Sequence, residues 1–64
     1  MTDLKRANLY VVNGIICDYK DFSGNYPTVA DVRNNWQFDY LKIDITDEEI
    51  SDVIQRVKKL DGAN

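Results

Sequence analysis

The sequence predicts an α+β fold of order β-β-α-β-α, in which two helices pack on one face of a three-stranded, mostly antiparallel sheet. Three observations lead to this prediction: an Asn-Gly pair between two apolar runs, a helix start at Thr28, and a complete set of helix signals after Thr46. The 64 residues are enough for one domain, which we assign to residues 1–64. A chain this short buries only about 60% of its unfolded surface, so a partner surface is a common supplement to its stability.

A β-hairpin is expected over residues 4–22, with its turn at Asn13-Gly14. A two-residue turn of this kind needs positive φ at both positions, which Asn and Gly tolerate best. The turn places Val12 opposite Ile15, and side chains alternate between the two faces of the sheet. One face then carries Tyr10, Val12, Ile15, Cys17 and Tyr19, and we expect it to face the helices. Leu9, Val11 and Ile16 would form an apolar patch on the other face.

The middle of the chain is expected to form a short helix and a third strand. Residues 23–27 are a loop by composition. Thr28 is a predicted N-cap, with Asp31 in the position of a capping-box partner, and the helix is expected to end near Trp36. Residues 36–45 alternate well enough to predict a strand, with a bulge near Tyr40.

The last segment carries the most consistent helix pattern. Thr46 and Glu49 form a capping box, and Ile45 and Ile50 occupy the positions of a hydrophobic staple. Acidic residues follow the predicted start and lysines precede the predicted end, as the helix dipole favours. The apolar stripe that should pack on the sheet consists of Ile50, Val53, Ile54, Val57 and Leu60.

The residue types argue against a catalytic, metal-binding or cofactor-binding function. Histidine is absent and Cys17 is the single cysteine, so the usual zinc sets and a His-activated thiol are excluded. The three glycines are isolated and form no phosphate-binding loop. The acidic cluster of residues 44–52 lacks calcium-loop spacing, and we interpret it as helix-dipole complementation. We therefore expect no enzyme activity, no cofactor, no metal and no small-molecule substrate.

Net charge and composition limit the kinds of partner and the cellular compartment that we expect for this protein. Eleven acidic residues against eight basic ones give a net charge of −3, which argues against nucleic acid as a partner. No apolar run is long enough to predict a membrane helix, and we expect a cytoplasmic protein. The abundance of Asp, Asn, Ile, Lys and Tyr is typical of an AT-rich genome, which favours a bacterium or a phage as the source.

The function predicted from these features is a non-catalytic interaction protein, such as a regulator, an inhibitor or an accessory subunit. Its predicted partner-binding residues are Leu9, Val11, Ile16, Phe22 and Tyr26, since apolar and aromatic surface residues commonly mark contact surfaces. A homo-oligomeric structural protein that uses the same patch on a second copy is the alternative. A nucleic-acid binder is a third possibility, and it requires Lys5, Arg6, Lys20 and Lys42 to converge on one face. Core packing is favoured for Trp36 and Phe38.

Overall fold

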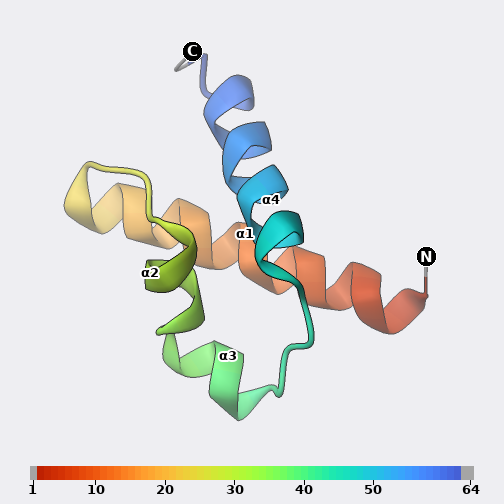
Figure 1. Ribbon diagram of the computed structural model, residues 1–64. Coiled ribbons are helices and arrows are strands. Elements are labelled where there is room, and N and C mark those ends of the chain that lie inside the picture. Colours follow the sequence, from red (N-terminus) through yellow and green to blue (C-terminus); the bar gives the residue numbers. More distant parts are fainter. Residues whose placement is uncertain (1, 63–64) are drawn as a thin grey trace.

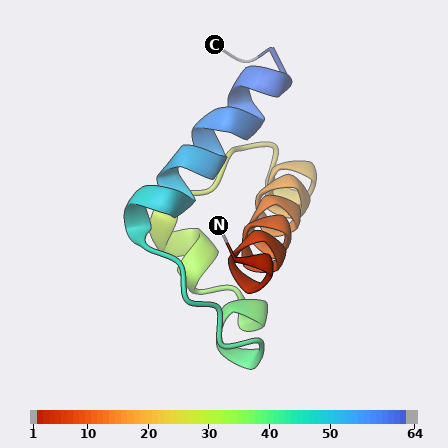
Figure 2. The same ribbon diagram turned by 90° about the vertical axis from the view of Figure 1, so that its right-hand side faces the viewer.

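The computed structural model describes residues 2–62, and within them the chain forms four helices and no strand. The predicted α+β fold with its three-stranded sheet is therefore wrong. The helices are α1 (Asp3–Ser23), α2 (Val29–Arg33), α3 (Trp36–Tyr40) and α4 (Asp47–Leu60). Helix α4 crosses α1 near the middle of α1 (Figure 1), and in the second view α1 forms one layer while α2 and α4 form the other (Figure 2).

The predicted hairpin is replaced by the long helix α1, which runs straight through Asn13 and Gly14. Its buried residues are Val12, Ile15 and Ile16. Two adjacent buried residues are incompatible with the alternation of a strand, whereas spacings of three and four residues place all three side chains on one face of a helix. The burial of one continuous helical stripe therefore outweighs the turn preference of Asn-Gly.

Both ends of α1 are capped by local hydrogen bonds. The backbone N–H of Lys5 donates to Oγ1 of Thr2 over 3.1 Å, and Asp3 adds a negative charge to the first turn. At the other end, Gly24 adopts a φ of 79°, a left-handed conformation that favours glycine, and its N–H donates to the carbonyl of Lys20. These caps allow α1 to end before the loop that leads to α2.

Replacing Gly14 with alanine should stabilise the domain by about 1 kcal/mol, because glycine in a helix interior is that much less favourable than alanine. Gly14 is exposed, and a Cβ at this position would meet no other part of the domain within 4 Å. Urea unfolding followed by circular dichroism measures the change. A hairpin would give the opposite sign, since alanine resists the positive φ of its turn; a destabilised Gly14→Ala variant would therefore contradict the continuous helix.

Helix α2 has the predicted start. The Asp31 N–H donates to Oγ1 of Thr28, and the Thr28 N–H donates to Oδ2 of Asp31 over 2.9 Å, which completes the capping box. The hydrogen bond from the Thr28 backbone lowers the pKa of Asp31. Val32, in the middle of this one-turn helix, is fully buried.

The predicted third strand over residues 36–45 is also wrong, because its first half is the short helix α3. The Asn35 side chain caps this helix by accepting from the Gln37 N–H over 2.9 Å. After α3, Lys42 adopts a φ of 50°, and the Ile43 N–H reaches back to the carbonyl of Phe38. This is the hydrogen bond of a Schellman motif, and the buried Phe38 and Ile43 are the apolar pair that commonly accompanies it.

Helix α4 starts as predicted. The Thr46 N–H donates to Oε1 of Glu49 and the Glu49 N–H donates to Oγ1 of Thr46, so the capping box is present. The salt bridge from Lys5, followed by the Thr46 backbone, lowers the pKa of Glu49. Of the predicted apolar stripe, Leu60 alone is exposed; the other four residues are buried, although they pack against helices rather than against a sheet.

A single hydrophobic core lies where the helices meet. It includes Phe38, as expected, whereas Trp36 is 68% exposed, contrary to the prediction that it packs in the core. Cys17, predicted to be buried, is exposed. The whole core consists of Val12, Ile15, Ile16, Val32, Phe38, Ile43, Ile45, Ile50, Val53, Ile54 and Val57.

Candidate functional site: two corners where α4 crosses α1

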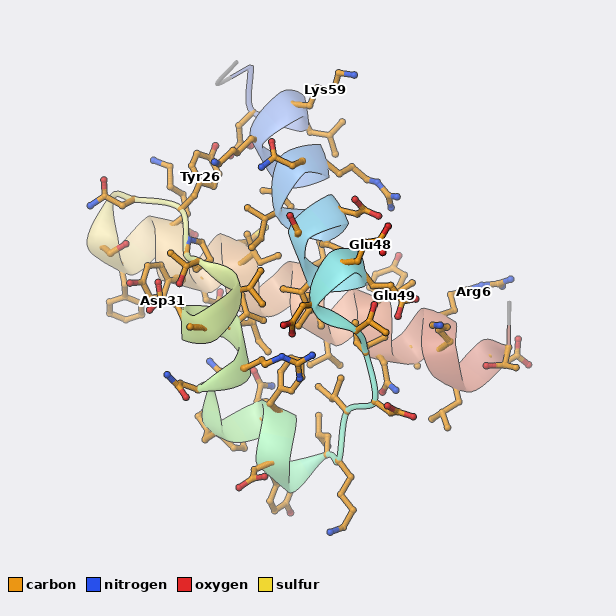
Figure 3. All side chains as sticks on the ribbon, viewed as in Figure 1. Arg6, Tyr26, Asp31, Glu48, Glu49 and Lys59 are labelled. Atoms are coloured by element: carbon orange, nitrogen blue, oxygen red, sulfur yellow. The ribbon has the colours of Figure 1, made fainter. Side chains whose placement is uncertain are left out.

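The crossing of α1 and α4 leaves a corner on each side of α4, and the chain fills one of them. We call this one the closed corner, defined by Lys20, Tyr26, Pro27, Lys58 and Asp61. It lies on the side of α4 where the loop from α1 to α2 passes, and Tyr26 points toward the second half of α4 (Figure 3). Pro27 is buried and Tyr26 is half-buried against the core.

The Tyr26 ring is held between the two helices by polar groups. Its hydroxyl donates to Oδ2 of Asp61, just beyond α4, over 2.7 Å. The Nζ atoms of Lys20 from α1 and Lys58 from α4 lie 5.2 and 5.5 Å from the ring centroid, within the range of a cation–π interaction. The hydrogen bond to Asp61, together with desolvation, raises the pKa of Tyr26.

The corner on the other side of α4 is a groove of about 360 Å³ that no segment among residues 2–62 fills. We call it the open corner. Leu9 and Val53 are its less exposed apolar residues, while Tyr10 and Leu60 are 77% and 80% exposed. Its lining residues are Arg6, Leu9, Tyr10 and Asn13 from α1 and Val53, Arg56 and Leu60 from α4.

Two arginines give the open corner a positive charge. Arg6 from α1 and Arg56 from α4 both line the groove, and in residues 2–62 neither has a carboxylate oxygen within 4.0 Å. The neighbouring Lys5, in contrast, pairs with Glu49 over 2.7 Å. Figure 3 shows Arg6 and Tyr26 on opposite sides of α4. The open corner therefore combines apolar surface with two cations that form no ion pair within residues 2–62.

The structure separates the residues predicted to bind a partner. Leu9 lines the open corner, whereas Val11 is half-buried against the core and Ile16 is fully buried. Phe22 is 96% exposed near the end of α1, and Tyr26 fills the closed corner. One of the five thus reaches the open corner, and Ile16 has no surface to offer in this fold.

Sequence reasoning missed the other residues of the open corner because it assigned residues 4–22 to strands. Arg6, Leu9, Tyr10 and Asn13 follow the spacing i, i+3, i+4, i+7, which places them on one helical face. That spacing is the signal that could have identified the α1 wall. The α4 wall depends on which helix crosses α1, and no local pattern contains that information.

A second exposed apolar surface lies on α3 and just after it. The Trp36 and Tyr40 rings pack edge to face, with centroids 5.8 Å apart and planes at 61°, and both are largely exposed. Leu41 beside them is 46% exposed. A shallow depression of about 510 Å³ lies nearby, lined by Arg33, Phe38, Asp39, Lys42 and Ile43.

Several of the titratable residues make local structural contacts. Arg33 pairs with Asp47 and donates from Nη2 to the carbonyl of Ile45 over 2.8 Å, which ties α2 to the segment before α4. Within residues 2–62 no group of three or more acidic or cysteine residues is arranged to bind a metal ion. The acidic cluster at the start of α4 thus includes Asp47, paired with Arg33, and Glu49, the capping partner of Thr46.

Of the four cations that a nucleic-acid face would require, Lys5 and Arg6 are neighbours near the start of α1, whereas Lys20 and Lys42 lie elsewhere in the chain. Arg6 and Lys20 are near opposite ends of α1, about 21 Å apart along its axis at 1.5 Å per residue. Lys5 is paired with Glu49, and Lys42 follows α3. Their placement gives no continuous basic stripe.

Fold and site together define a small all-α domain with an apolar, positively charged groove between its two longest helices. The chain matches no protein-family model, no curated protein and no solved structure. None of the helices in the described part of the chain is both long enough and apolar enough to span a membrane.

Proposed function

We propose that this protein is a non-catalytic interaction domain that binds another protein through its open corner. The observation that carries the proposal is the contrast between the two corners. The chain covers the closed corner with Tyr26, whereas Leu9, Tyr10, Val53 and Leu60 are left to line an unfilled groove.

Physical chemistry supports a contact at this place. A contiguous exposed apolar patch on a small domain usually marks a contact surface, and Tyr and Arg are enriched among the residues that dominate binding. A partner that binds only the folded state also stabilises it, which matters for a domain of this size. As part of the same proposal we place the protein in the cytoplasm, because one cysteine allows no internal disulfide.

A second copy of the chain is the second candidate partner. The exposed Trp36, Tyr40 and Leu41 support it, since a self-associating surface needs apolar area of this kind. Their surface lies on and just after α3, away from the α1 and α4 walls of the open corner.

Photo-crosslinking in the native cells tests binding at the open corner, whereas light scattering of the purified chain tests self-association through the α3 surface. Tyr10 is replaced with a benzophenone amino acid, and Asp18, an exposed α1 residue outside the open corner, receives the same group as a matched control. We expect discrete adducts with another protein from position 10 and none from position 18. An adduct of twice the chain mass would identify a second copy instead. Equal labelling at both positions, or no adduct at position 10, would contradict binding at the open corner.

A further inference from the structure

The two corners have the same construction, although one is filled and the other is not. In the closed corner, one cation from α1 and one from α4, Lys20 and Lys58, face an aromatic ring. In the open corner, one cation from α1 and one from α4, Arg6 and Arg56, line an apolar groove. The closed corner therefore shows, within this molecule, what kind of group fits between these helices.

The open corner is lined by residues that can make stronger contacts of the same kinds. A guanidinium stacks on an aromatic face more readily than an ammonium does, and it binds a carboxylate through two parallel hydrogen bonds. The exposed ring of Tyr10 offers an edge-to-face contact to a second ring. Asn13 adds a side-chain amide that can bond to a phenol hydroxyl or an indole N–H.

We propose that the open corner binds an aromatic side chain, Tyr or Trp, from a segment of the partner protein that also carries a carboxylate next to that side chain. This inference rests on the proposed function and names the chemistry of the partner. The ring lies over Leu9 and Val53, between Arg6 and Arg56. The carboxylate neutralises the two arginines, which have no acidic partner within 4.0 Å in residues 2–62.

Selection from a phage library of random 12-residue peptides tests the inference. The full chain is immobilised, and peptides are eluted by competition with excess free chain. We expect the enriched peptides to share one Tyr or Trp with Asp or Glu within two positions. For a synthetic peptide of that sequence, Arg6→Gln and Arg56→Gln should each weaken binding about two- to tenfold, the range that a cation–π contact of roughly 0.5–1.4 kcal/mol gives.

Lys59→Gln is the matched control. It removes the same charge from the exposed side of α4 outside the open corner, and Figure 3 shows Lys59 near the end of that helix. This variant should bind the peptide as tightly as the unchanged chain. Circular dichroism of all three variants confirms that the fold is kept. If Lys59→Gln weakens binding as much as the arginine variants do, general electrostatic attraction explains the affinity and the inference is overturned.

The other outcomes separate this inference from the proposed function. The enriched peptides could lack an aromatic residue and still lose their binding in Leu60→Glu. That result would contradict the aromatic side chain in the inference and leave the open corner as a protein-binding site. Aromatic peptides whose binding is unaffected by the arginine variants would overturn the role of the two cations. If no peptide is enriched, the inference fails, while crosslinking at position 10 still decides whether a protein occupies the open corner.

Discussion

Replacing Ile16 with aspartate should unfold the domain. Ile16 is fully buried at the centre of α1, on the face that packs against α4. A carboxylate there would lose its hydration without gaining a partner, a cost of several kcal/mol. A 64-residue domain has a total stability of only about 3–10 kcal/mol, so this single change removes most or all of it.

Circular dichroism at 222 nm and a thermal melt measure the result. Cys17→Asp is the matched control, because Cys17 is the next residue of the same helix and is exposed. This variant should remain helical and melt cooperatively within a few degrees of the unchanged chain. A cooperative melt of Ile16→Asp would show that Ile16 is not buried and would contradict the packing of α1 on α4.

Residues 9–16 show why a local turn signal misled the prediction. Asn13 and Gly14 are the preferred residues of a two-residue hairpin turn. The flanking apolar pairs, residues 11–12 and 15–16, fit a helix better, because they recur after four residues. A hairpin of these residues would be apolar on both faces near its turn. This is unusual for a sheet that has one face in solvent, and it was the evidence against the hairpin. In the helix, Gly14 costs only about 1 kcal/mol, whereas the burial of Val12, Ile15 and Ile16 contributes several.

The start of α4 could be predicted because every local signal there agrees. The capping box of Thr46 and Glu49, the acidic first turn and the apolar stripe all require the same helix. Residues 36–45 lacked this agreement. Their weak alternation suggested a strand, while the Asn35 cap that starts α3 was missed because the preceding helix was expected to extend to about Trp36. Short helices of this kind depend on packing, here of Phe38 into the core.

The open corner could not be predicted from the sequence because it belongs to a crossing of two helices. Leu9 was predicted to be a contact residue, but on a sheet face that the described residues do not form. Arg56 and Leu60 reach the same groove only because α4 lies across α1, and the choice of helix partners is set by the whole core. The closed corner likewise requires the loop that carries Tyr26 to lie beside α4, where the Tyr26 hydroxyl reaches Asp61.

Replacing Ile50 with alanine should lower the free energy of unfolding by about 2–5 kcal/mol. This is the range for deleting a buried branched side chain, where the loss of apolar burial adds to the cost of the remaining cavity. Ile50 is fully buried on α4, and with the buried Ile45 it occupies the staple positions that set how the chain enters this helix. The substitution therefore weakens both the core and the start of α4.

Urea unfolding of Ile50→Ala measures this loss, and Gln55→Ala is the control for helix propensity. Gln55 is exposed on α4, so its replacement should change stability by no more than about 0.5 kcal/mol. For a domain of this size, the expected loss corresponds to a melting temperature lower by at least about 10 °C. If Ile50→Ala loses less than 1 kcal/mol, Ile50 is not enclosed between α4 and the rest of the core. The crossing that forms both corners would then have to be revised, because Ile50 and Val53 lie on adjacent turns of α4 and both pack in that core.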